Sequence, residues 1–239
     1  MNTTSASPAD APRRILVWDA PVRVFHWLLA LCFAGAYVTA ESESWRLLHV
    51  TLGYTFGGLL VFRVLWGLVG TRHARFRSFV KGPAAVRGYL RGLFSRHPEH
   101  HVGHNPAGAL AIVAILGLGL ALAASGFVLY EELAGDWVEE VHEVLGNALL
   151  LVVGVHILGV LVSSRLHHEN LVASMVTGRK LGDPRDGIRR AWGGLAAVML
   201  AAVLGFWWLQ WQQAPAGGLD APSAHAKQDR RQGHDRDDD

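Results

Sequence analysis

The segment VHEVLGNALLLVVGVHILGVLVS, residues 141–163, determines the fold of this 239-residue chain. It is apolar enough to cross a bilayer as a helix, which takes about 20 residues. It carries His142 and His156, separated by 14 positions. At about 100° per residue that spacing falls about 40° short of four turns, so both imidazoles project from nearly the same face, ~21 Å apart along the axis. The pattern predicts a stripe facing a helical bundle, with one histidine near each membrane surface.

Four further apolar runs have the same character and cover residues 22–40, 47–70, 106–130 and 191–211. The composition agrees, since 51% of the residues are hydrophobic and 18% are charged, which is less charge than soluble domains usually carry. We expect an all-α integral membrane protein, in which a four-helix transmembrane bundle precedes a fifth, C-terminal transmembrane helix. A formal net charge of +2 does not favour nucleic-acid binding.

The first run also has an interpretation as a cleaved signal peptide. Arg13 and Arg14 precede it, and small residues end it at Ala40. Arg23 and His26 interrupt its start, however, and the run is long and aromatic. A retained transmembrane helix is therefore the favoured interpretation.

Lysine and arginine residues lie in alternate segments of the chain, and this bias predicts the orientation in the membrane. The N-terminal segment and the segments 71–105 and 164–190 are rich in arginine. Residues 131–140 carry five acidic residues and no lysine or arginine. We therefore expect a cytoplasmic N-terminus and a periplasmic C-terminus. The terminal segments 1–14 and 213–239 are polar and are expected to be disordered.

Four of the thirteen histidines lie inside the apolar runs, namely His26, His49, His142 and His156. Ionisable residues at membrane depth are costly and tend to mark function. Neutral imidazole is a good axial ligand for haem iron, and bundle cores often hold cofactors. The chain has one cysteine, Cys32, and no C-x-x-C-H motif, so a haem would not be attached covalently. Two stacked redox centres are expected.

Depth predicts how these ligands pair, because two ligands can share one iron only at the same level of the membrane. His26 lies near the cytoplasmic end of its helix, and His156 lies toward the same side. His49 and His142 both lie near the outer surface. We therefore expect the pairs His26/His156 and His49/His142.

Other residues admit two interpretations. Arg23 and Arg63, near the cytoplasmic ends of the first two runs, could pair with haem propionates or could snorkel to the interface. The loop from His97 to His104 could bind a metal, although such loops are more often solvated. Glycines could admit a flat macrocycle or simply allow helix packing. These are Gly53, Gly57, Gly58, Gly146 and Gly154.

Several motifs resemble the bacterial cytochrome b561 / nickel-hydrogenase cytochrome b family. They are VWDAPVRVFHW at 17–27, FRVLWG at 62–67 with GTRHARF at 70–76, GHNP at 103–106, and the segment 142–178. The resemblance implies a four-helix di-haem core with two haems b per chain, held by His26, His49, His142 and His156. It further implies a bacterial inner-membrane protein, surrounded by lipid, that exchanges electrons with quinone and a partner cytochrome or dehydrogenase.

The expected organisation is a tail at 1–14, a cytochrome b561-like domain at 15–182, an extra transmembrane helix at 183–212 and a polar tail at 213–239. The extra helix has no histidine and lies outside the resemblance, so we expect it to be dispensable for haem binding.

The competing function is a transporter or proton channel whose histidines relay protons without haem. It predicts acidic residues inside the helices, where only Glu143 comes close. A membrane zinc hydrolase is disfavoured because Gly146 stands where an H-E-x-x-H motif needs its second histidine. A visible spectrum before and after reduction distinguishes these classes.

Overall fold

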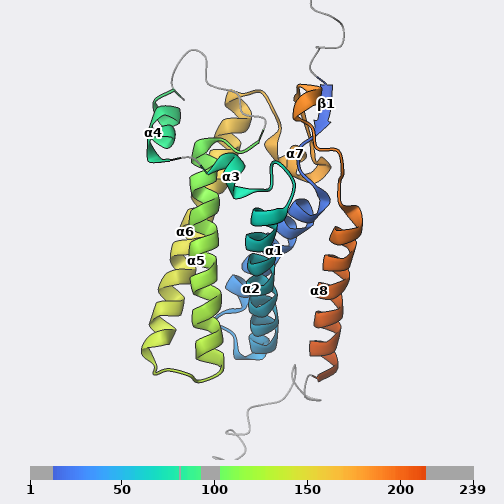
Figure 1. The fold of residues 1–239 in the computed structure, drawn as a ribbon. Helices are drawn as coiled ribbons and strands as arrows, with labels where there is room; N and C mark the ends of the chain where they lie inside the picture. The colour runs from blue at the N-terminus through green and yellow to red at the C-terminus, as the bar shows by residue number, and fades with distance from the viewer. Residues whose placement is uncertain (1–12, 81, 93–102, 214–239) are drawn as a thin grey trace, which may run out of the picture.

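Five long helices run side by side in the structure, a computed structural model that describes residues 13–80, 82–92 and 103–213 (Figure 1). They are α1 (Ala20–Thr39), α2 (Arg46–Val69), α5 (Pro106–Tyr130), α6 (Trp137–Leu166) and α8 (Gly193–Gln213). All five are long and apolar enough to cross a membrane. The expected all-α membrane fold is therefore confirmed. The largest boundary difference is at α6, which begins at Trp137 where the sequence predicted Val141.

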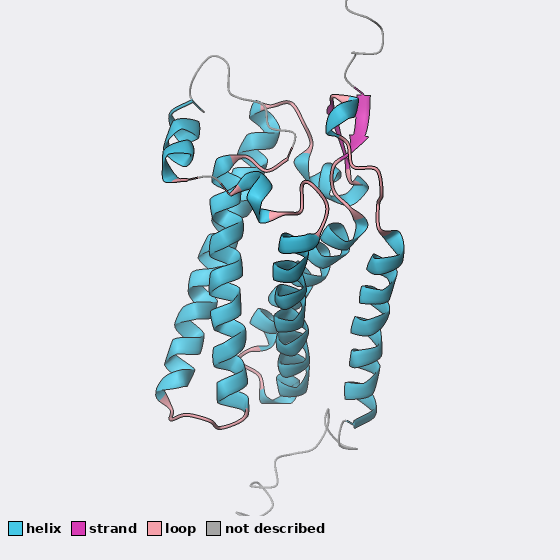
Figure 2. Ribbon diagram, in the orientation of Figure 1, coloured by secondary structure: helices cyan, strands magenta, loops and turns pink. Residues whose placement is uncertain are grey.

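Shorter elements, which the sequence did not predict, lie before and after the long helices in the chain, and most of them lie at one end of the bundle (Figure 2). They are strand β1 (Arg13–Leu16), 3₁₀ helix η2 (Glu43–Trp45), helices α3 (Phe76–Phe79), α4 (Pro83–Gly92) and α7 (Leu171–Thr177), strand β2 (Arg179–Gly182) and 3₁₀ helix η3 (Pro184–Asp186). Strands β1 and β2 pair antiparallel, with Arg13 opposite Gly182 and Leu16 opposite Arg179. Strand β1 thus begins inside the segment expected to be a disordered tail. The remainder of that tail, residues 1–12, and the C-terminal tail from 214 lie outside the described residues.

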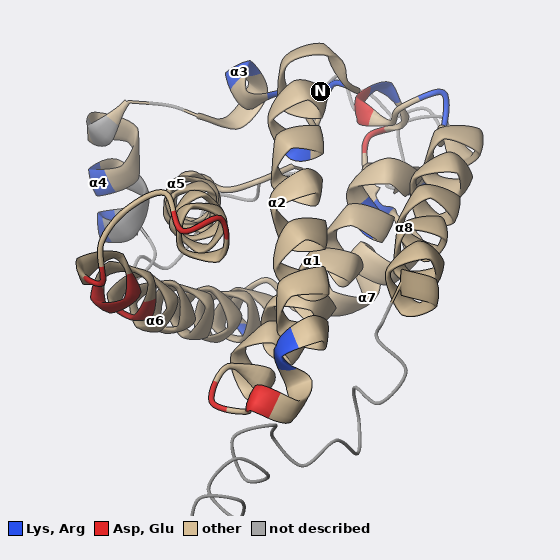
Figure 3. Ribbon diagram, turned by 90° about the horizontal axis from the view of Figure 1, so that it is seen from below, with Lys and Arg blue, Asp and Glu red and all other residues tan. Residues whose placement is uncertain are grey.

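The two ends of the bundle differ in charge. The end that carries β1, α3, α4, α7 and β2 is called here the basic end (Figure 1). The opposite end, the acidic end, carries η2 and the turn between α5 and α6. Acidic residues cluster on that turn and on the first turn of α6 in the view from below (Figure 3). The alternation of charge along the chain therefore becomes a separation of charge in space.

Tryptophans mark the acidic end. Trp45 precedes α2, Trp137 begins α6, and Trp208 and Trp211 lie in the last turns of α8. All four side chains are exposed. Amphipathic aromatic rings are enriched where a membrane meets water. Their common level supports a membrane interface at this end of the bundle.

The buried carboxylate of Asp19 joins the start of α1 to the end of α2. Its Oδ1 accepts a hydrogen bond from the backbone N–H of Val22 at 2.8 Å, which caps α1. Its Oδ2 accepts from Trp66 Nε1 at 3.1 Å and from Thr71 Oγ1 at 2.6 Å. Because Asp19 is only 1% exposed, these bonds offset the cost of burying its charge. The basic end of the α1–α2 pair is fixed in this way.

The helices pack as two antiparallel pairs, α1 with α2 and α5 with α6, which meet where α2 packs on α5. Leu60 of α2, Leu149 of α6 and Cys32 of α1 are fully buried at the centre. Most of the large apolar side chains of α6 are exposed, as expected of a helix that faces lipid or a cofactor rather than protein.

Helix α8 packs against α1 and α2. Its Met199 and Val203 belong to the central hydrophobic core. Trp207 Nε1 donates to Thr55 Oγ1 of α2 at 2.9 Å. The segment before α8 is also attached, since Ala20 N–H donates to Ala191 O at 2.7 Å. The fifth helix therefore shares the core of the α1–α2 pair.

Candidate functional site

The four histidines inside the long helices lie at two levels of the bundle. Helix α1 begins at the basic end, whereas α2 and α6 both begin at the acidic end (Figure 1). His26 is therefore near the basic end, and His49 and His142 are near the acidic end. His156 lies further along α6, toward the basic end. All four side chains are half-buried.

His49 and His142 face each other at the acidic end. Their ring centroids are 6.3 Å apart, and their planes are inclined by 71°. Imidazoles bonded to opposite sides of one metal ion at about 2.0–2.1 Å place their centroids about 6 Å apart. The separation of this pair therefore fits a shared axial-ligand site.

Hydrogen bonds fix the orientation of both rings. His49 Nδ1 lies 2.8 Å from the carbonyl oxygen of Ala36, which can only accept, so Nδ1 is the donor. His142 Nδ1 lies 2.9 Å from Ser125 Oγ, whose own proton goes to Leu122 O at 2.9 Å. His142 Nδ1 therefore also donates. Both rings keep Nε2 as the nitrogen that can bind a metal, which is the usual arrangement of ligating histidines.

A second contact at this level links α1 to α6. Tyr37 Oη donates to Asn147 Oδ1 at 2.8 Å. Tyr37 and Asn147 lie on the two helices that carry His26 and His142. The link holds α6 beside α1, although the main packing partner of α6 is α5.

His26 and His156 form the second pair, at the basic end. His26 and His156 lie close enough for their charges to interact. The His26 ring packs edge-on against Trp27, with centroids 5.1 Å apart. Its Nδ1 is buried and has no hydrogen-bond partner in the described part of the chain. The structure thus places His26 toward His156 and His49 toward His142, and their assignment as ligands stays a prediction.

Both arginines proposed as propionate partners lie at the basic end. Arg63 is 4% exposed, and its guanidinium carbon lies 5.0 Å from the centre of the Phe76 ring. It is buried, so the alternative in which it snorkels to the interface is wrong. Arg23 Nη1 donates to Val176 O at 2.7 Å. Arg23 Nε and Arg63 Nη1 are buried without a hydrogen-bond partner among the described residues, as suits groups that recognise an anion.

The glycines divide between the two interpretations. A methyl group at Gly57 would lie 3.3 Å from Ala123 Cβ, and one at Gly146 would lie 3.9 Å from Leu122, so these two serve helix packing. Methyl groups at the other three would meet no described atom within 4 Å. Of these, Gly53 follows His49 by one helical turn, so there is room beside that ring.

Two loop histidines do not behave as solvated residues. His73 is 8% exposed, and its Nε2 lies 2.8 Å from the carbonyl oxygen of Asp186. His104 lies between the rings of Trp18 and Phe79, with centroids 4.5 Å away in each case. The GHNP motif was the only sequence signal for His104. The other histidines of the 97–104 loop lie outside the described residues, and the described part of the chain contains no group of three or more His, Cys, Asp or Glu side chains that could hold a metal ion.

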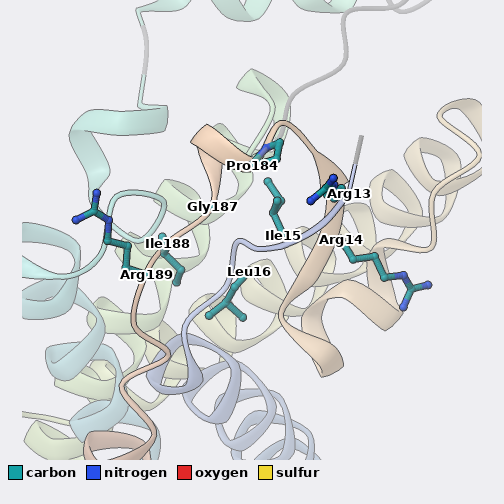
Figure 4. Close-up of a pocket in the computed structure, with 8 residues that line it drawn as sticks. All are labelled: Arg13, Arg14, Ile15, Leu16, Pro184, Gly187, Ile188 and Arg189. Carbon is teal, nitrogen blue, oxygen red and sulfur yellow. The ribbon is translucent and has the colours of Figure 1, made fainter. Parts of the chain in front are cut away.

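A surface pocket of about 320 Å³ lies at the basic end, away from the four histidines. Strand β1 and residues 184–189 line it (Figure 4). Arg14 and Arg189 point to opposite sides of the pocket. The arginines therefore do not converge on one anion, and the histidine pairs remain the candidate site.

The family model described as prokaryotic cytochrome b561 matches residues 17–178. The chain is also similar to proteins named probable Ni/Fe-hydrogenase B-type cytochrome subunits. It is 28% identical to that of Rhizobium leguminosarum bv. viciae, over 72% of this chain and 91% of the relative. It is 29% identical to that of Azotobacter vinelandii, over 70% of this chain and 88% of the relative.

The match to the probable Ni/Fe-hydrogenase 1 B-type cytochrome subunit of Escherichia coli K12 is shorter. The two chains are 28% identical over 48% of this chain and 60% of the relative. This chain thus spans less than two thirds of the length of that relative. No solved structure matches the chain.

Proposed function

Because the chain belongs to the prokaryotic cytochrome b561 family, it is a membrane b-type cytochrome of electron transfer, and we propose that it binds two haems b. One is held by His49 and His142 near the acidic end, and the other by His26 and His156 near the basic end. The observation that carries the proposal is the 6.3 Å separation of the His49 and His142 rings. When bound, haem b supplies one-electron chemistry through its iron.

The residues around each ring prepare it for ligation. Ala36 O and Ser125 Oγ accept the Nδ1 protons of His49 and His142, which leaves Nε2 of each ring unprotonated and available to iron. The buried Arg63 and the half-buried Arg23 provide guanidinium groups for the propionates of the haem at the basic end. The absence of a C-x-x-C-H motif makes both haems non-covalent.

The two sites lie at different depths, so the chain carries electrons across the membrane. His142 and His156 are separated by ~21 Å along α6. The positive-inside bias places the basic end in the cytoplasm of a bacterial cell. The N-terminus is then cytoplasmic and the C-terminus periplasmic, in the inner membrane.

The partners follow from the family and its named relatives. The relatives are named as hydrogenase subunits, which supports a dehydrogenase as the protein that exchanges electrons with this chain. A partner cytochrome would serve the same role. The quinone pool is the second partner, because quinones dissolve in the lipid that surrounds these helices.

A redox titration of leucine variants tests the haems and their pairing. His26→Leu and His156→Leu should remove one titrating component, and His49→Leu and His142→Leu the other, because each iron loses one of its two ligands. A pyridine haemochrome assay should give two haems per chain in the parent protein.

A parent protein with no visible absorption would refute the haem proposal and leave the proton channel. If His26→Leu removed the same component as His142→Leu, the pairing would be wrong.

A further inference from the structure

Buried nitrogens without a hydrogen-bond partner among the described residues gather at the basic end. They belong to Arg23, His26, Arg63, Arg75 and His104. Three belong to residues near helix ends: Arg23 lies in the first turn of α1, Arg63 lies in the last third of α2, and His104 lies just before α5. Buried polar groups are normally hydrogen-bonded, so a concentration of such nitrogens indicates a place where a ligand is recognised.

His104 is the member of this group whose ring is most tightly held. The rings of Trp18 and Phe79 lie 4.5 Å from it, each inclined by 50°. The next residue, Asn105, caps α5 by accepting a hydrogen bond from Gly108 N–H at 2.7 Å. Pro106 then begins the helix. The capped start of α5 that follows His104 and the two rings around it therefore fix its position relative to the bundle.

Arg63 is the second fixed group. Its guanidinium lies over the Phe76 ring and is almost completely buried. The nearby carboxylate of Asp19 already accepts hydrogen bonds from Val22, Trp66 and Thr71. Arg63 Nη1 has no partner within the described ranges. A buried guanidinium is costly without an anion, so this nitrogen suits a carboxylate.

His104 shares its surroundings with Arg63 and with one proposed haem ligand. Burial lowers the pKa of His104 to about 3, and the charges of Arg63, Lys180, His73 and His156 act in the same direction. The ring is therefore a neutral imidazole at physiological pH, with one N–H to donate. Arg63 and His156 both lie close enough for their charges to act on this ring.

We propose that His104 donates a hydrogen bond to a propionate of the haem at the basic end, beside Arg63, and so positions that haem. The inference rests on the proposed function, because it requires a haem between His26 and His156. Its basis is the juxtaposition of a clamped imidazole, a buried guanidinium and a proposed ligand at one end of the bundle. A haem propionate is a carboxylate, which these two donors recognise.

The test combines redox titration of the purified holoprotein with redox-difference infrared spectra of haem labelled with ¹³C at its propionate carboxyls. His104→Leu removes the donor, whereas His104→Gln keeps an N–H. His73→Leu is the matched control, because His73 is buried in the loops of the same end but lies 2.8 Å from Asp186 O.

We expect His104→Leu to lower the midpoint potential of the component that His26→Leu removes, and to shift the labelled carboxylate bands. Without the donor, the propionate charge is less compensated and stabilises ferric iron. His104→Gln should restore most of both signals, and His73→Leu should change neither.

Unchanged bands in His104→Leu would overturn the inference, as would loss of the haem in both His104→Leu and His104→Gln. The proposed function fails separately, if the parent protein lacks two titrating components or if neither component depends on His26.

Discussion

At the residue scale, helix α5 holds the ring of His142 from two directions. Ser125 Oγ lies 2.9 Å from Nδ1 and sets the rotation of the ring. The adjacent Gly126 leaves space for the ring edge, because a methyl group there would lie 2.9 Å from Cε1 of His142. One turn of α5 therefore sets both the orientation and the distance of a proposed ligand on α6.

Gly126→Ala tests this arrangement. The added methyl should displace the His142 ring by a few tenths of an ångström and strain its bond to iron, at a cost of about 1–3 kcal/mol for overpacking. We expect the haem at the acidic end to dissociate more readily from the protein. The midpoint potential of its component in the redox titration should also shift. Gly117→Ala on the same helix is the control, since a methyl there meets no described atom within 4 Å. Equal behaviour of the two variants would contradict the role of Gly126.

At the element scale, α8 is attached to only one of the two helix pairs. It packs on α1 and α2 and carries no histidine. Met199 and Val203 join the central core, and Trp207 donates to Thr55. Its contribution therefore concerns the stability of the α1–α2 pair more than the coordination of haem.

A chain that ends after Trp192 should keep both haem bands but unfold at a lower temperature. The truncation is placed after Trp192 because a chain that ended at Pro184 would also lose two contacts of the preceding segment. Asp186 forms a salt bridge with Arg72 at 3.0 Å, and Ile188 N–H donates to Leu16 O at 2.8 Å. Trp207→Phe isolates the hydrogen bond, for which a loss of about 0.6 kcal/mol is expected inside a membrane. Thermal unfolding followed by haem absorbance measures the loss of stability in the truncated chain and in Trp207→Phe. Loss of both haems in the truncated chain would make α8 part of the haem-binding core.

The long helices could be predicted because a bilayer imposes length and apolarity, which a local pattern reveals. Helix α5 begins and ends where the sequence places it, at Pro106 and Tyr130. Strands β1 and β2 could not be predicted, because each is short and its partner is far away in the chain.

The same distinction applies to the candidate site. The four intramembrane histidines stand out because ionisable groups are rare at that depth. The roles of Ser125 and Asp19, and the burial of His104, depend on contacts with other elements. His104 looks like part of a polar loop until Trp18 and Phe79, from two distant segments, enclose its ring.

At the scale of the whole molecule, the two ends of the bundle differ in charge. The basic end carries the arginine-rich segments, and the acidic end carries the α5–α6 turn (Figure 3). Four exposed tryptophans, Trp45, Trp137, Trp208 and Trp211, also lie at the acidic end. Positive residues favour the cytoplasmic side, and tryptophan favours either interface. The two features together support the proposed orientation of the bundle in the bilayer.

Reporter fusions test this orientation. Alkaline phosphatase fused after Gln213 should be active, because the proposed orientation puts that end of α8 in the periplasm. A green fluorescent protein fused after Gly92 should fluoresce, because α4 lies at the basic end, which the same proposal puts in the cytoplasm. The reverse pattern would invert the proposed topology and the assignment of each haem to its side.

The pairing of β1 with β2 has a consequence for the order in which the protein is made. Strand β1 leaves the ribosome first, but its partner at residues 179–182 follows only after α1, α2, α5 and α6. At about 5–20 residues per second, the first strand waits roughly 10–30 s for the second. The two strands can therefore pair only after four transmembrane segments have been synthesised, which makes their pairing a late step in the folding of the chain.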